Sequence, residues 1–400
     1  MVSSRWLPVA LLWVVALLNY LDRQVIFSLF PLLQKDLQLS SLQLGLLSTA
    51  FLWIYAAASP LGGFLADRYG RKRVVVVSLL LWSAITWATG QARSLNELLA
   101  ARAFMGLSEA CYLPAALALI AAHHTGATRS LATGIHQSGI YAGIVLGGVG
   151  GGWLGERFGW RFPFTVLGLI GLGYCVFLLL LKEAPGEPSE RSGVSLTHTA
   201  SHLLRKPAFL ALLAVFAATS IANWLIYTWM PVYLYEKFGM SLAQAGFSAT
   251  FYMQAGSFAG ILAGGALADR WSRTNSNGRV FTQALGLVAA APFLILAGVT
   301  GTPVVLLAGL AVFGIARGMY DCNWMPVLCQ IAPSQMRSTG YGLLNMAGTF
   351  AGGTVAALAG GLKATLGIGM MLQAAGAILL LSALLLVRLR LTSSPEAAPQ

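Results

Sequence analysis

Twelve long apolar runs dominate this chain, and each is close to the length that an α-helix needs to cross a membrane. A bilayer core of about 30 Å takes about 20 apolar residues in helical form. The runs are continuous, whereas membrane strands alternate apolar and polar residues over shorter stretches. We therefore expect an all-α membrane protein with twelve transmembrane helices. The runs lie near residues 6–29, 43–66, 74–92, 96–121, 130–154, 162–181, 208–233, 243–268, 280–298, 303–330, 338–361 and 367–387.

The charge content supports a membrane protein and excludes several other classes. Only 10% of the 400 residues are charged, against about 25% in soluble domains. A soluble enzyme, a disordered chain and a nucleic-acid binder are therefore excluded. Sixteen of the 25 basic residues fall on one side of the predicted spans and six on the other. By the positive-inside rule we expect a multi-pass protein of the inner (plasma) membrane with both termini in the cytoplasm.

The two halves of the chain repeat one another. The longest polar stretch, 183–207, separates an N-terminal six-helix bundle at 1–182 from a C-terminal six-helix bundle at 208–400. The heptapeptide Gly62–Arg68 recurs as Gly264–Arg270 with six of seven residues identical. Parallel six-helix repeats are typical of transporters. A many-spanned protein without a transport role is the alternative.

The sequence GGFLADRYGRKR at residues 62–73 resembles the signature loop of the major facilitator superfamily. The resemblance implies a loop between the second and third helices that latches the cytoplasmic gate. Glycines permit close helix approach, and an acidic side chain can meet the positive end of a neighbouring helix. The rival interpretation is that the basic residues only fix topology. The predicted gating residues are Gly62, Asp67, Arg68, Arg71, Asp269 and Arg270.

Further motifs resemble the anion:cation symporter branch of that superfamily. These are the stretch Leu18–Arg23, the pair Arg102 and Glu109, and the stretch Gly159–Arg161. Spinster-type transporters share the Asp-Arg and Arg…Glu pairs, but Ala132–Gly139 is more similar to the anion branch. The resemblance implies transport of sugar acids, dicarboxylates and related organic anions. A Spinster-like carrier of lysolipids or other amphipathic lipids is the alternative.

The fifth predicted helix distinguishes symport from antiport within this resemblance. The superfamily's antiporters have a Gly-Pro step there, and no proline follows any glycine of 139–152. The resemblance therefore favours proton-coupled symport over antiport. The same glycines predict close packing with a neighbouring helix.

Six strong charges lie inside the predicted spans, and they sum to zero. Each costs at least ~2.5–3.5 kcal/mol at a helix centre, so each is a candidate functional residue. Two of them lie four residues apart on one helix, and the alternative interpretation is that these two form a purely structural ion pair. The six are Asp22, Arg23, Arg102, Glu109, Arg317 and Asp321, of which Arg317 and Asp321 form the last pair.

A coupling mechanism follows from the four charges of the first half. Arg23 and Arg102 bind the carboxylate of the substrate, because guanidinium groups suit planar anions. Asp22 and Glu109 carry protons, and their protonation releases the arginines for the incoming anion. Arg102 has a second interpretation, since it resembles an arginine of the superfamily's fourth helix that serves coupling instead of binding.

Polar and aromatic residues elsewhere in the spans are further candidates for substrate contact. Packing and anchoring at the membrane interface are their rival interpretations. No phosphate-binding loop, HExxH motif or clustered metal ligands occur, so we expect neither an enzyme nor a cofactor or metal. The expected partners are a small organic anion, a proton and the lipid bilayer, with the chain monomeric. The additional substrate candidates are Tyr20, His136, Gln137, Tyr227 and Asn345.

Overall fold

The computed structural model describes residues 5–124, 129–181, 196–333 and 336–388, and every regular element in these ranges is a helix. Nine segments of this part are long and apolar enough to cross a membrane. The last of the nine holds two spans, because Gly367 (φ 71°) interrupts α15. The helices α7 and α11 are not among the nine, but each is long enough to be a further span, which gives twelve in the described residues. The predicted all-helical class with twelve transmembrane helices is therefore confirmed.

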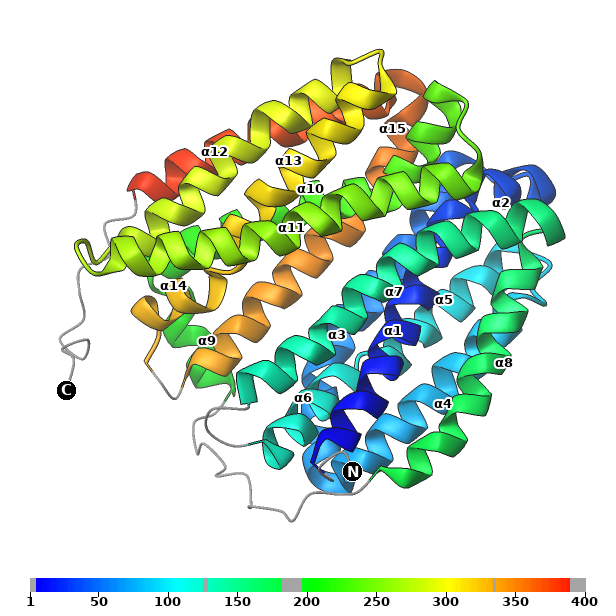
Figure 1. Ribbon diagram of the computed structural model, residues 1–400, viewed down its shortest axis with the longest axis horizontal. Helices are drawn as coiled ribbons and strands as arrows, with labels where there is room; N and C mark the ends of the chain where they lie inside the picture. The colour runs from blue at the N-terminus through cyan, green and yellow to red at the C-terminus, as the bar shows by residue number, and fades with distance from the viewer. Residues whose placement is uncertain (1–4, 125–128, 182–195, 334–335, 389–400) are drawn as a thin grey trace. The chain divides into compact units, whose positions relative to one another are not determined.

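The helices of the first half follow the predicted runs closely (Figure 1). One short helix, α2, was not predicted; it buries Phe30 and Leu33 beyond the end of α1. The elements are α1 (Trp6–Ser28), α2 (Phe30–Leu37), α3 (Ser41–Tyr69), α4 (Arg71–Thr89), α5 (Leu95–Glu109), α6 (Tyr112–His123), α7 (Arg129–Phe158), α8 (Arg161–Phe177) and the 3₁₀ turn η2 (Leu178–Leu180).

The second half begins with a short helix inside the stretch that the sequence predicts to be a linker. This helix, α9, buries Leu203 and Thr199. The remaining part of that stretch, 182–195, lies outside the described residues. The elements are α9 (Leu196–Leu204), α10 (Pro207–Phe238), α11 (Leu242–Ser272), α12 (Gly278–Val299), α13 (Pro303–Asp321), α14 (Trp324–Ile331) and α15 (Arg337–Arg388).

The fourth predicted span of each half is divided into two helices. In the first half α5 ends at Glu109 and α6 begins at Tyr112. In the second half α13 ends at Asp321 and α14 begins at Trp324. Both breaks directly follow a buried or half-buried carboxylate. Each of these carboxylates therefore lies at a helix C-terminus, where the helix dipole is unfavourable for negative charge.

The described residues fall into two units of contacts. The first comprises the described residues up to 181 together with 227–250 and 356–361. The second comprises 196–226, 251–355 and 362–388. In the first unit α1 packs along α7 and α4 packs along α8 (Figure 1). Its apolar core includes Val15, Leu79, Trp82 and Tyr112.

Side-chain caps define where two helices of the first unit begin. Ser40 Oγ accepts a hydrogen bond from the Gln43 amide, and Gln43 Oε1 accepts one from the Ser40 amide, which forms a capping box for α3. At the start of α5, Ser94 Oγ accepts a hydrogen bond from the Glu97 amide. Caps of this kind satisfy the amide groups that a helix start leaves without partners.

A stripe of glycines on α7 brings its backbone against α1. Gly139, Gly143, Gly147 and Gly151 recur every four residues and face Trp13, Leu17, Leu21 and Val25 of α1, which have the same spacing. A Cβ atom at any of the four would overlap atoms of α1. The close packing predicted from the small-residue spacing is therefore present.

This packing predicts opposite effects for two alanine substitutions in α7. Gly143→Ala should lower the Tm of the purified protein, because the new methyl group overlaps the Leu17 carbonyl oxygen. Gly150→Ala should leave the Tm unchanged or raise it, because that site is open and alanine favours helix by about 1 kcal/mol over glycine. Thermal unfolding in one detergent tests both; equal shifts would contradict the packing argument.

Asp36 at the end of α2 joins this helix to the start of α8. Its Oδ2 accepts hydrogen bonds from Trp160 Nε1 at 2.8 Å and Arg161 Nη1 at 2.6 Å. Arg161 also donates to the Ala92 carbonyl oxygen. Gly159 (φ 83°) makes the turn that places these donors. The Gly159–Arg161 motif therefore has a structural function in this chain.

This junction predicts a pH dependence of stability. The Trp160 and Arg161 hydrogen bonds lower the pKa of Asp36 below its usual 3.8. A lowered folded-state pKa contributes stability above the unfolded pKa, and that contribution is lost as the pH falls through the folded value. Asp36→Asn should therefore reduce stability at pH 7 by about 1 kcal/mol or less. The difference from wild type should shrink below about pH 4; a Tm difference that does not vary with pH would refute this.

Candidate functional site

The glycine stripe of α7 fixes the direction in which the charges of α1 point. Leu21 faces α7, and successive helical residues rotate by 100°. Asp22 therefore points sideways from the α1–α7 contact, and Arg23 points about 200° away from Leu21. Both side chains are buried, Asp22 at 2% exposure and Arg23 at 8%.

Arg23 forms an ion pair with Glu109 inside the first unit. Arg23 Nε donates to Glu109 Oε2 at 2.5 Å, and the Glu109 side chain is fully buried. Because Glu109 ends α5, its negative charge lies at the unfavourable pole of that helix and needs a cation nearby. Glu109 Oε1 and the amide nitrogen of neighbouring Asn19 are buried without a hydrogen-bond partner of normal geometry among the described residues.

Three aromatic rings surround the Arg23 guanidinium. Its central carbon lies 4.7 Å from the ring centre of Tyr20, 4.9 Å from that of Phe51 and 4.5 Å from that of Tyr55. Cation–π contacts of this kind stabilise a cation that has lost its water. The rings and Glu109 together enclose the guanidinium.

Asp22 has a different neighbour. Its Oδ2 accepts a hydrogen bond from Thr86 Oγ1 of α4 at 3.2 Å. Its Oδ1 is buried and has no hydrogen-bond partner among the described residues. Asp22 therefore contacts α4, whereas Arg23 contacts α5.

Arg102 lies deeper than Arg23 and is bonded to neutral groups. Its Nε donates to the Leu47 carbonyl oxygen at 3.3 Å, and its guanidinium lies 4.6 Å from the Phe51 ring centre. The side chain is 1% exposed. Phe51 therefore contacts both guanidinium groups, and no carboxylate oxygen within 4.0 Å of Arg102 is present among the described residues.

The remaining candidate substrate residues of the first unit do not form one cluster. His136 is fully buried and its Nε2 lies 2.8 Å from Tyr112 Oη, which in turn donates to the Leu12 carbonyl oxygen. The adjacent Gln137 is exposed. Tyr20 and Tyr227 are both partly buried and pack against the apolar core of the first unit.

The second unit contains its own ion pair. Arg317 Nε lies 3.1 Å from Asp321 Oδ2, one helical turn along α13. Gln254 Oε1 accepts a hydrogen bond from Arg317, and Trp324 Nε1 donates to Asp321. Asn345 lies half-buried on α15.

Some of the predicted gating residues have described surroundings. Gly62 approaches the Ala110 carbonyl oxygen so closely that a Cβ atom would lie 2.6 Å from it. Arg71 Nη1 donates to the Ala118 carbonyl oxygen. Asp269 pairs with Arg279 at 3.5 Å, and Arg270 is exposed. The side chains of Asp67 and Arg68 lie outside the described residues.

Sequence analysis missed two residues of the charge cluster. Thr86 holds Asp22, and Phe51 separates the two arginines. The hydroxyl residues Ser83, Thr86 and Thr89 recur every three positions in an otherwise apolar run, and this pattern marks a buried face of α4. No sequence signal distinguishes Phe51 from other apolar residues of its helix.

Twelve membrane spans in two repeated halves, with a neutralised set of charges buried in the first unit, define a secondary transporter of small solutes. The chain belongs to the Major Facilitator Superfamily, whose family model matches residues 12–357. It is therefore a membrane transporter and not an enzyme.

Known proteins similar to this chain agree with that assignment. It is 29% identical over 387 residues to the probable galactarate/D-glucarate transporter GarP of Escherichia coli (strain K12), covering 88% of this chain and 86% of that protein. It is 29% identical over 330 residues to the hexuronate transporter of Bacillus subtilis (strain 168), covering 78% of each. The predicted resemblance to the sugar-acid branch is confirmed at this level.

A solved structure of similar fold is a bacterial homologue of the human lysosomal transporter Spinster, crystallised inward-facing and unoccupied. The TM-score is 0.79 at 21% identity, covering 97% of this chain and 95% of that one. At this identity the likeness establishes the fold alone.

The buried pair predicts non-additive stability effects. Arg23→Met should destabilise the protein by ~3–5 kcal/mol, because it leaves the Glu109 carboxylate buried without a cation. The double variant Arg23→Met/Glu109→Gln should be more stable than Arg23→Met alone. A thermal-unfolding cycle with both single variants measures the coupling; strictly additive shifts would show that the two groups do not interact.

Proposed function

We propose that this chain is a proton-coupled symporter that takes up a small organic anion, such as a sugar acid, by alternating access. The substrate class is supported by the named substrates of its relatives, galactarate, glucarate and hexuronate. The observation that carries the proposal is the Arg23–Glu109 pair, which places a guanidinium and a carboxylate in one buried, aromatic-lined site.

Protonation of Glu109 is the coupling step. A neutral Glu109 leaves the Arg23 guanidinium buried without an anionic partner, which is unfavourable by several kcal/mol. A substrate carboxylate restores the balance with two parallel hydrogen bonds to the guanidinium. After the site opens to the other side, Glu109 loses its proton and pairs with Arg23 again, which expels the anion.

Asp22 is the second proton site, and Arg102 supplies the second positive charge of the cluster. Asp22, Arg23, Arg102 and Glu109 sum to zero charge, so each bound proton admits one substrate carboxylate without net charge. A hexuronate with one carboxylate then requires one proton, and a hexarate with two requires two. Arg102, behind Phe51, serves coupling in this scheme and contacts a second carboxylate only after rearrangement.

The other predicted roles belong to the same proposal. Tyr20, His136, Gln137, Tyr227 and Asn345 are proposed to line the substrate path. Gly62, Asp67, Arg68, Arg71, Asp269 and Arg270 are proposed to gate it. Arg317 and Asp321 are proposed as a structural or second charge pair. We further propose two six-helix bundles at 1–182 and 208–400 joined by 183–207, and a monomer in the inner membrane with cytoplasmic termini.

A ligand screen separates the proposed substrate class from the alternative. Galactarate, glucarate and glucuronate should raise the Tm of the purified protein, whereas a lysophosphatidylcholine should not. The Arg23→Ala variant should lose the sugar-acid effect. Stabilisation by the lysolipid alone would support the Spinster-like alternative instead.

Transport into proteoliposomes tests the coupling. Each coupled proton supports about a tenfold accumulation per pH unit, because one pH unit corresponds to about 1.36 kcal/mol. Wild-type protein should therefore accumulate glucuronate about tenfold and galactarate about a hundredfold for each unit of external acidification. Glu109→Gln should lose pH-driven accumulation and keep exchange of labelled for unlabelled substrate.

Glu97→Gln is the matched control for that variant. Glu97 lies on the same helix, caps its start and is remote from the cluster. It should retain full accumulation. Accumulation by Glu109→Gln equal to that of this control would exclude Glu109 as the proton carrier.

A further inference from the structure

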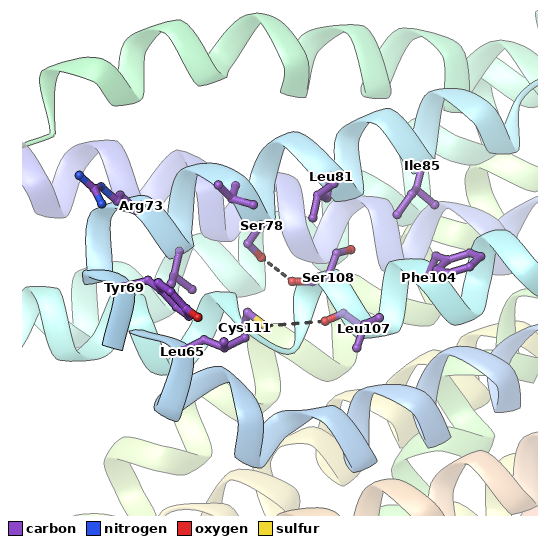
Figure 2. A pocket seen from close by; sticks show the side chains of 12 residues that line it. Leu65, Tyr69, Arg73, Ser78, Leu81, Ile85, Phe104, Leu107, Ser108 and Cys111 are labelled. Atoms are coloured by element: carbon purple, nitrogen blue, oxygen red, sulfur yellow. Dashed lines mark hydrogen bonds between the residues drawn. The ribbon is translucent and has the colours of Figure 1, made fainter. Parts of the chain in front are cut away.

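A long apolar groove runs along the outer surface of the first unit (Figure 2). Residues of α3, α4 and α5 line it, and its volume is about 770 Å³. The walls include Val77, Leu81, Phe104 and Leu107, all of them exposed. The groove lies apart from the buried charge cluster, and the proposed transport cycle does not use it.

The groove has about the depth of one membrane leaflet. Arg73 and Tyr69 lie at one end, and Ile85 and Phe104 lie at the other (Figure 2). Arg73 and Ile85 are twelve residues apart on α4, which is about 18 Å along a helix. Half of a hydrocarbon core of about 30 Å is about 15 Å. The groove therefore matches the length of an acyl chain that starts at the membrane surface.

Apart from Tyr69 and Arg73 at one end, the polar side chains that line the groove are already hydrogen-bonded. Ser78 Oγ donates to the Ser108 carbonyl oxygen, and Cys111 Sγ donates to that of Leu107 (Figure 2). Ser108 Oγ donates to the Met105 carbonyl oxygen. Between its ends the groove consequently presents mainly carbon atoms. This composition suits an alkyl chain.

One end of the groove carries a basic side chain. The neighbouring Arg71 and Lys72 donate to the carbonyl oxygens of Ala118 and Leu179. Arg73 is exposed, lines the groove and makes no such bond among the described residues. A positive group at the surface end of an apolar channel complements a lipid with an anionic headgroup.

We propose that the groove between α3, α4 and α5 binds one anionic phospholipid, with an acyl chain along Val77, Leu81 and Phe104 and its phosphate at Arg73. The bound lipid covers the exposed apolar walls and fixes α4 against α5. This site is independent of the transported solute.

Native mass spectrometry of the full chain in a neutral detergent tests the headgroup. Phosphatidylglycerol should remain bound about fivefold more than phosphatidylcholine with the same acyl chains, as expected for one basic contact. Arg73→Gln should remove that preference. Arg273→Gln removes another exposed cation, which lies in the second unit and outside the groove, and this variant should keep the preference. Equal retention of both lipids by wild type, or equal losses in both variants, would overturn the proposal.

The native thiol of Cys111 reports occupancy of the groove itself. Phosphatidylglycerol should slow alkylation of Cys111 by N-ethylmaleimide, measured by peptide mass spectrometry, and should leave Cys175 on α8 unaffected. Arg73→Gln should abolish the slowing. Phosphatidylglycerol that binds without protecting Cys111 occupies another site and overturns the proposal. Protection of Cys111 by a lysolipid that the reconstituted protein also transports assigns the groove to substrate and likewise overturns it.

Discussion

Hydrocarbon does not tolerate an unpaired charge, and this constraint organises the first unit. Asp22 and Arg23 lie on α1, Arg102 and Glu109 lie on α5, and each of these residues is at most 8% exposed. Each helix alone would insert one acidic and one basic side chain that form no ion pair with each other. Assembly of α1 with α5 makes the Arg23–Glu109 pair, and assembly with α4 gives Asp22 a donor. Helix packing and charge compensation are therefore one event, and any change in protonation acts on both.

The glycine stripe of α7 sets the helix packing on which this charge compensation depends. Gly143 and Gly147 allow α1 to lie directly on α7, which fixes the rotation of α1 about its own axis. That rotation directs Arg23 toward α5. A larger side chain on α7 would move α1 outward and would separate Arg23 from Glu109. Small residues of α7, packed against one face of α1, thus determine the electrostatics on the opposite face of α1.

The sequence allowed prediction of the twelve spans, the repeat and the residue types of the charge cluster, because run length and insertion cost are local properties. The breaks at Ala110–Cys111 and Cys322–Asn323 were not predicted, since each lies inside a run of the right length for a single span and neither contains glycine or proline. Thr86 and Phe51 were missed because their importance depends on which helix packs beside them. Arg102 was expected to pair with acidic side chains, yet it donates to the Leu47 carbonyl oxygen. A backbone acceptor of this kind leaves no pattern in the sequence.

The repeat has diverged in the sign of one charge, while the charges inside the predicted spans still sum to zero in each unit. Glu109 and Arg317 are 208 residues apart, the same offset that relates Tyr112 to Tyr320. A carboxylate in one half thus corresponds to a guanidinium in the other. Glu109 pairs with Arg23 in the first unit, whereas Arg317 pairs with Asp321 in the second. Because the charges inside the spans of each unit balance, in the proposed cycle a proton on Glu109 would unbalance the first unit alone, and an anion at Arg23 would restore the balance.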